Sequence, residues 1–175
     1  LTSVTDQYAT ASICGPNSKK ILQKLFPKVD FDEKKFPHMS FKNSEIEGIE
    51  CRIMRISFTG ELSYEINIES KYGKTLWEKC LEAGKEYRIT PYGTEAMHLL
   101  RAEKGFIIVG QDTDGTMTPI DLQMDWIVSK KKYDFIGKRS LYRSDTMRED
   151  RKHLIGLLTD DPNEVLEEGS QIVED

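Results

Sequence analysis

The sequence predicts an α+β fold, in which strands paired as hairpins pack against separate helices. Residues 51–58 and 64–69 are rich in β-branched and large apolar side chains and flank a Thr59-Gly60 turn, a pattern typical of a hairpin. Residues 72–87 instead carry apolar side chains at spacings of one, three and four, the period of a helix with one buried face. The two periodicities therefore place strands and helices in the same domain.

The chain before this hairpin contains further local signals. Residues 8–13 suit a strand, and Gly15-Pro16 then introduces a helix that continues to Leu25. Short strands are predicted at residues 39–42 and 46–49. The order of elements is therefore strand, helix, strands, helix.

Two helices are predicted after the hairpin. In the first, the helical spacing places Trp77 and Cys80 in the core. Thr94 should cap the second, whose buried side includes Leu99 and which ends at Gly105. Both helices are expected to be amphipathic.

The chain changes character towards its C-terminus. A strand or an extended run is predicted at residues 106–109 and a strand at residues 126–130, with a polar loop between them. Charge dominates residues 144–152, which suggests a linker, and strand-like segments follow at residues 153–158 and 170–173.

These changes define two predicted domains. The first covers residues 1–144, and residues 145–175 hold a linker and the start of a second, β-type domain. Because the chain begins at Leu1 without an initiating Met, we expect it to be part of a longer polypeptide.

The composition excludes several classes of protein. The 175 residues are 38% hydrophobic and 31% charged, with a net charge of -5, which argues against a broad nucleic-acid-binding face. No apolar run approaches the ~18 residues of a membrane span, so no membrane partner is expected. The three cysteines form no C-x-x-C pair, which favours a reducing, cytoplasmic location over a disulfide framework or a zinc site.

Common catalytic and metal motifs are missing from the sequence. It contains neither G-x-G-x-x-G nor G-x-x-x-x-G-K-[ST], so neither a dinucleotide fold nor a P-loop is predicted. A calcium loop starting at Asp112 would need Gly and Glu where the chain has Met117 and Gln123. The three histidines lie far apart, with no nucleophile pattern beside them. We therefore predict no catalytic residue and no metal site.

Glu65 is the most informative candidate for ligand binding. In a strand with a period of two, Tyr64 and Ile66 share one face while Glu65 and Asn67 share the other. A carboxylate beside a turn accepts two parallel hydrogen bonds, which suits the paired N–H donors of a flat heterocycle. Spacing alone fits a solvated strand residue at least as well, so both interpretations stay open at this point.

Several separated motifs together resemble one family. Residues 58–65 read Phe-Thr-Gly-Glu-Leu-Ser-Tyr-Glu, residues 100–105 read Leu-Arg-Ala-Glu-Lys-Gly, and Gly110-Gln111-Asp112 and residues 134–138 follow in order. This order resembles the tetrahydrofolate-binding aminomethyltransferase family, which includes the T-protein of glycine cleavage. The resemblance covers nearly the whole chain and implies a folate-binding domain followed by the first strands of a β-barrel domain.

The details favour one branch of that family. Phe58 and Ser63 replace the Tyr and Gly usual in the T-protein, and residues 58–65 look like the alpha subunit of heterotetrameric sarcosine oxidase. The family's pterin-binding glutamate falls on Glu65, so the resemblance implies a cofactor site formed by Glu65, Phe58 and Tyr64. Met97 stands where the T-protein carries an arginine that contacts folate.

The resemblance also implies a division of labour. In the parent enzyme, flavin and NAD sites lie outside this chain, and the folate site captures the one-carbon unit released from sarcosine. The family's catalytic aspartate lies upstream of the segment corresponding to Leu1, so the chain should bind folate without catalysis. Its expected partners are folate and the other sarcosine oxidase subunits. Two alternatives remain: an aminomethyltransferase that works with a lipoyl carrier protein, and a folate-fold module kept only for assembly.

Overall fold

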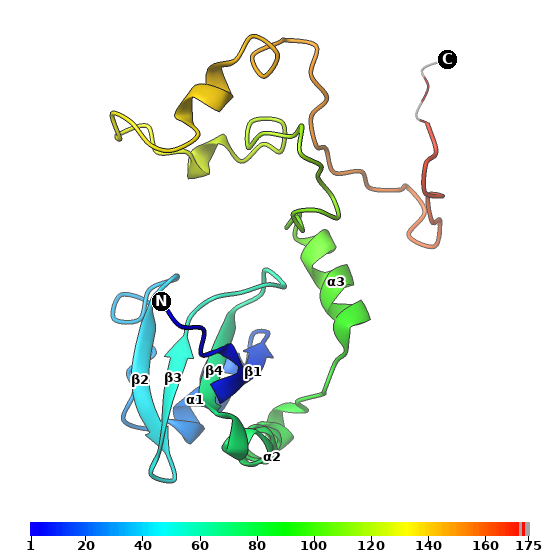
Figure 1. The fold of residues 1–175 in the computed structure, drawn as a ribbon. Coiled ribbons are helices and arrows are strands. Elements are labelled where there is room, and N and C mark those ends of the chain that lie inside the picture. The colour runs from blue at the N-terminus through cyan, green and yellow to red at the C-terminus, as the bar shows by residue number, and fades with distance from the viewer. Residues whose placement is uncertain (172, 174–175) are drawn as a thin grey trace. The chain divides into compact units, whose positions relative to one another are not determined.

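The computed structural model describes residues 1–171 and residue 173, and it shows a mixed helix-and-sheet fold (Figure 1). The chain divides into two compact units, residues 1–107 and 108–175. The main elements, all in the first unit, are β1 (Tyr8–Cys14), α1 (Ser18–Leu25), β2 (Phe41–Ile46), β3 (Ile49–Met54), β4 (Ser63–Glu69), α2 (Gly73–Gly84) and α3 (Thr94–Glu103).

The four strands form one antiparallel sheet in the order β1-β4-β3-β2. The predicted hairpin is confirmed, because β3 pairs with β4 from Cys51 opposite Ile68 to Met54 opposite Glu65. On its other side β4 pairs with β1, which places Ser12 directly opposite Glu65. Glu65 therefore lies on a central strand, between β1 and β3.

The turns of the sheet differ from the prediction. The strand predicted at residues 46–49 is wrong, because Glu47 and Gly48 have φ angles of 51° and 77° and form the turn between β2 and β3. Both residues adopt the left-handed backbone conformation, as the two central residues of this type of hairpin turn require. The strand predicted to reach residue 58 ends at Met54, because the backbone of Arg55 bonds to that of Met39 and Ser40 instead of to β4.

One face of the sheet carries the hydrophobic core. Helices α1 and α2 cover this face: Ile21 and Leu22 of α1 and Leu76 and Cys80 of α2 are buried in one cluster with the inward side chains of the strands (Figure 1). The strand members are Ile13, Ile46, Cys51, Ile53, Tyr64, Ile66 and Ile68. The loop between α1 and β2 adds Phe31 and Phe36.

The helical faces are only partly as predicted. Cys80 is buried, but Trp77 is 48% exposed, so its assignment to the core is wrong. Leu76 and Cys80 stand four residues apart on the inward side of α2, and Trp77 is turned about 100° away from Leu76. In α3 the predicted burial of Leu99 is also wrong, because its side chain is 62% exposed.

The strands predicted at residues 126–130 and 153–158 do not form. Residues 106–109 and 126–130 contain no strand, and Trp126 lies 74% exposed in a short 3₁₀ turn at Asp125–Ile127. Residues 153–158 run without ladder hydrogen bonds to any described residue. A strand needs a hydrogen-bonded neighbour, which local composition cannot supply. The strand predicted at 170–173 includes residue 172, which lies outside the described residues.

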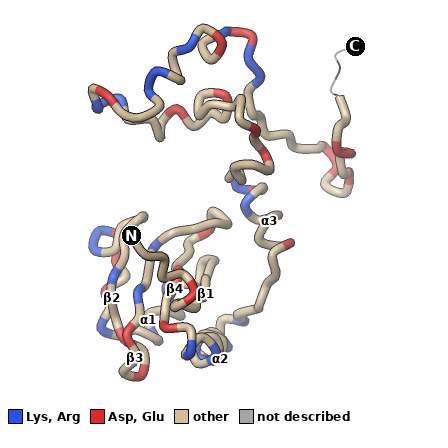
Figure 2. The backbone as a smooth tube through the Cα atoms, in the orientation of Figure 1, with Lys and Arg blue, Asp and Glu red and all other residues tan. Residues whose placement is uncertain are grey.

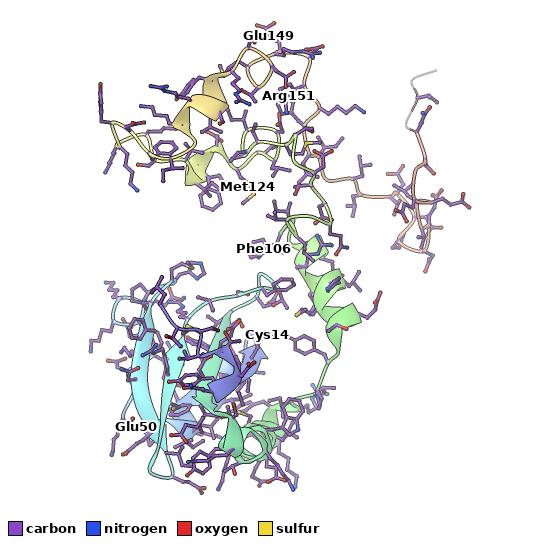
Figure 3. All side chains as sticks on the ribbon, in the orientation of Figure 1. Cys14, Glu50, Phe106, Met124, Glu149 and Arg151 are labelled. Atoms are coloured by element: carbon purple, nitrogen blue, oxygen red, sulfur yellow. The ribbon has the colours of Figure 1, made fainter. Side chains whose placement is uncertain are left out.

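A buried ion pair organises the second unit, in which acidic and basic residues are interspersed (Figure 2). Asp121 is 1% exposed and accepts hydrogen bonds from Arg151 Nε at 2.8 Å and Arg151 Nη2 at 2.7 Å. Arg151 is labelled in Figure 3. The Arg151 guanidinium holds the pKa of Asp121 well below its usual range. The predicted boundary at residue 144 lies inside this unit and stays a prediction.

Candidate functional site

The two faces of β4 differ as the alternation predicts. Tyr64, Ile66 and Ile68 are at most 1% exposed and face the core. Glu65 and Asn67 are partly exposed and face the opposite side of the sheet, which α1 and α2 leave uncovered. The candidate ligand-binding carboxylate therefore lies on the open face of the sheet.

The carboxylate of Glu65 is partly desolvated and open to a ligand. Its side chain lies between Ser12 of β1 and Met54 of β3, neither of which carries a charge. Burial raises its pKa above the usual value of 4.5. Within the part of the chain that the structure describes, no group donates a hydrogen bond to this carboxylate. Its oxygens can therefore accept hydrogen bonds from a bound molecule.

A tyrosine from a distant loop lies beside Glu65. Cys14, labelled in Figure 3, stands at the end of β1. Its thiol donates a hydrogen bond to the Tyr92 hydroxyl with an Sγ–Oη distance of 3.2 Å. Burial, followed by this hydrogen bond, raises the pKa of Tyr92 to about 12, and the charge of Glu65 adds to the shift. Tyr92 could not be recognised as a site residue from the sequence, because its Pro-Tyr-Gly context indicates only a turn.

Phe58 lies in the connection between β3 and β4 and not on a strand. Its ring is 42% exposed, and its centroid lies 6.5 Å from that of His98 on α3. The residue opposite Glu65 in β3 is Met54, so Phe58 is not its cross-strand partner. The loop also packs against the end of α3, since a Cβ at Gly60 would collide with the side chain of Lys104. Phe58 therefore presents a half-exposed aromatic surface held by α3.

Tyr64 lies on the other side of the sheet from Glu65. Its ring packs against Phe31 and Phe36, at centroid distances of 5.5 Å and 5.8 Å. With 1% of its surface exposed, its ring has no open side. The structure brings Glu65 close to Tyr92 and holds Phe58 on α3, but it separates the Tyr64 ring from the Glu65 carboxylate by the thickness of the sheet.

A pocket of about 440 Å³ runs along β1. Its lining includes Cys14 and Tyr92, the apolar residues Trp77, Leu81 and Ile89, and Met97 of α3. The lining takes residues from both faces of β1, which is an edge strand of the sheet. Tyr92 therefore borders both this pocket and the open face that carries Glu65.

Metal-binding clusters and membrane-spanning helices are both absent from the described residues. No group of three or more His, Cys, Asp or Glu side chains among them is arranged to hold a metal ion. In the same residues, no helix is long and apolar enough to cross a membrane.

Comparison with known proteins finds one matching family and two groups of named relatives. The profile of the GCVT N-terminal domain family matches residues 1–132. The chain is 55% identical over 175 residues to "Sarcosine oxidase subunit alpha" of Corynebacterium sp. (strain P-1) and 38% identical over 175 residues to the protein of that name from Rhizobium meliloti (strain 1021). Each alignment covers 99% of this chain and 18% of the relative.

A second group of relatives carries another name. "Aminomethyltransferase" of Halothermothrix orenii (strain H 168 / OCM 544 / DSM 9562) is 37% identical over 139 residues, which is 79% of this chain and 38% of that protein. Both groups agree with the family that the separated motifs indicated. The chain, which spans 18% of the length of its sarcosine oxidase relatives, belongs to the GCVT N-terminal domain family.

Proposed function

We propose that this chain is the tetrahydrofolate-binding module of a sarcosine oxidase alpha subunit, where it captures the one-carbon unit released by oxidative demethylation of sarcosine. The observation that carries the proposal is Glu65, a partly desolvated carboxylate with no hydrogen-bond donor among the described residues. The identity of 55% to a sarcosine oxidase alpha subunit supports this branch of the family.

The residues around Glu65 fit a reduced pterin. The carboxylate would accept the N3–H and the 2-amino group of the ring through two parallel hydrogen bonds. The half-exposed ring of Phe58 would lie against the ligand, and Tyr64 would support β4 from the core. Tetrahydrofolate, when bound, would supply the nitrogen that takes up the one-carbon unit.

Other parts of the parent enzyme would carry the oxidation. Because the chain spans 18% of those relatives, we assign the flavin and NAD sites to the remaining polypeptide and to the other subunits, which are the proposed partners. The chain itself would bind folate without turnover. We place the enzyme in the cytoplasm, where the free thiols of Cys14, Cys51 and Cys80 would stay reduced.

An aminomethyltransferase is the second candidate, because relatives with that name align over 79% of the chain. Such an enzyme would act with a lipoyl carrier protein, and a dinucleotide-binding motif elsewhere in the same polypeptide would favour the oxidase instead. A module kept only for assembly would bind no folate at all.

Calorimetric titration with 5-formyltetrahydrofolate, a stable reduced folate, tests the site. Glu65→Gln replaces one acceptor oxygen with a donor, which should weaken binding by ~1 to 3 kcal/mol while the thermal melt stays unchanged. Glu69→Gln is the matched control, because Glu69 lies on the same face at the exposed end of β4 and should not affect binding. Equal affinities for wild type and Glu65→Gln would refute the site, and a folded wild type that binds no folate would favour the assembly module.

A further inference from the structure

The loop between α2 and α3 brings a hydroxyl group to the open face of the sheet. Tyr92 Oη accepts the hydrogen bond from Cys14 Sγ at 3.2 Å, and Ser12 also interacts with this oxygen. Ser12 and Cys14 point to the same side of β1, two residues apart. The Tyr92 hydroxyl is thus held above the end of β1 by Cys14, on the side of the strand that also carries Ser12.

This position lies beside Glu65. Ser12 is the cross-strand partner of Glu65, and directly opposed residues have Cβ atoms about 4.5 to 5.5 Å apart. The Tyr92 hydroxyl bonds to Cys14, on the same side of β1 as Ser12, and the charge of Glu65 contributes to raising its pKa, so it lies near the carboxylate. The two groups come from segments 27 positions apart in sequence, and the pairing of β1 with β4 brings them together.

The Tyr92 hydroxyl keeps its own hydrogen available. Its oxygen accepts the hydrogen bond from Cys14, which leaves the O–H bond free to donate. The pKa of Tyr92, raised to about 12, keeps this hydrogen in place at neutral pH. The open face of the sheet thus offers a carboxylate acceptor and a hydroxyl donor next to each other.

The edge of a pterin ring has the complementary pattern. The 2-amino group and N3–H are adjacent donors, and the 4-carbonyl oxygen beside N3 is an acceptor. We propose that Tyr92 is a binding and specificity residue of the folate site, whose hydroxyl donates a hydrogen bond to the 4-carbonyl oxygen while Glu65 accepts the two N–H donors. This inference rests on the proposed function.

The test is a titration of the full 175-residue chain with 5-formyltetrahydrofolate. Tyr92→Phe removes only the hydroxyl and should lower the affinity about 3- to 10-fold, the usual effect of losing one neutral hydrogen bond. Tyr87→Phe is the matched control. The Tyr87 ring also borders the pocket along β1, and Lys20 and Lys24 lie over it. Removing the Tyr87 hydroxyl should leave folate binding unchanged.

A double-mutant cycle separates ligand contact from general packing. Cys14→Ala removes the group that orients the Tyr92 hydroxyl, so it should weaken binding in the wild type and have no further effect in Tyr92→Phe. Thermal melts of every variant provide the folding control.

The outcomes distinguish the role of Tyr92 from the folate site itself. If Glu65→Gln weakens binding and Tyr92→Phe does not, the inference about Tyr92 is wrong and the folate site stands. If neither substitution changes the affinity, or if the folded wild type does not bind, both are overturned. Equal losses in Tyr92→Phe and Tyr87→Phe would show a packing effect and also contradict the assignment.

Discussion

At the scale of single residues, neighbouring positions in β4 have opposite environments. Tyr64 is held in an aromatic cluster with Phe31 and Phe36, whereas Glu65 meets the polar open face of the sheet. The first arrangement fixes the strand, and the second leaves a carboxylate for a ligand. A residue that holds the fold and the residue proposed to bind the ligand are therefore adjacent in sequence and on opposite faces of the sheet.

Phe58 provides a test at this scale. If its half-exposed ring lies against the pterin, Phe58→Ala should weaken folate binding by ~0.5 to 1.5 kcal/mol beyond the loss of buried area, and Phe58→Tyr should be tolerated. Calorimetric titration measures both. Phe41→Ala is the control, because Phe41 is an exposed aromatic residue of β2, the strand farthest from β1. Unchanged affinity in a folded Phe58→Ala variant would remove Phe58 from the site.

At the scale of elements, the contribution of each helix to the stability of the fold depends on which of its side chains pack against the sheet. In α2, Leu76 and Cys80 are 1% and 4% exposed, while Trp77 borders the pocket along β1. In α3, Leu99 is open and Arg101 is the residue with little exposed surface, at 8%. Helix α2 therefore contributes to the core, and α3 contributes mainly through the loops it contacts.

This difference predicts unequal effects of the same substitution. Leu76→Ala removes a fully packed side chain and should lower the free energy of unfolding by ~2 to 5 kcal/mol. Leu99→Ala, at a 62% exposed position, should change it by less than ~0.5 kcal/mol. Urea unfolding followed by far-ultraviolet circular dichroism measures both. Similar losses for the two variants would show that α3 buries Leu99 in solution.

At the scale of the whole molecule, the two units are stabilised differently. The first has a hydrophobic core beneath a sheet, whereas the second contains no strand within its described residues. Its organising contact is polar: Asp121 accepts hydrogen bonds from Arg151 and from the backbone and hydroxyl of Thr118. Arg151 also donates to the carbonyl oxygen of Thr116 at 2.7 Å. The second unit should therefore be more sensitive to charge and pH than the first.

Asp121→Asn tests this contact. The variant leaves Arg151 without its carboxylate partner, so the Thr118 amide, which bonds to Asp121 Oδ2 at 2.7 Å, should exchange about tenfold faster or more. Hydrogen exchange at neutral pH measures it. Asp150→Asn, at an exposed pair with Arg148, is the control and should leave this amide unchanged. Equal exchange rates in wild type and Asp121→Asn would mean that the pair does not hold the unit together.

The same contact sets a pH dependence. Because Arg151 lowers the pKa of Asp121 in the folded state, the stability it contributes is present above the unfolded value of 3.8 and is lost as the pH falls towards the folded pKa. Protection of the Thr118 amide should therefore decrease on acidification below pH 3.8.

The predicted domain boundary at residue 144 can be tested in the same protein. If it is correct, limited proteolysis should first cleave within residues 144–152.

Features that depend on neighbours along the chain could be predicted from local patterns. The alternation in β4 separated Tyr64 from Glu65, the helical period placed Cys80 in the core, and the separated motifs indicated the family. Each of these follows from local backbone geometry, in which two or 3.6 residues per repeat fix the direction of a side chain.

Contacts between residues far apart in the sequence became visible in the folded chain alone. The pairing of β1 with β4 carries Ser12 and Cys14 to Glu65 and so brings Tyr92 to the proposed site, a relation that no local spacing encodes. Apolar residues 106–109 were compatible with a strand but pair with no strand among the described residues, and Trp77 had the helical period but borders the pocket along β1. A strand is defined by its hydrogen-bonded neighbour and burial by what packs on top, and both depend on contacts far away in the sequence.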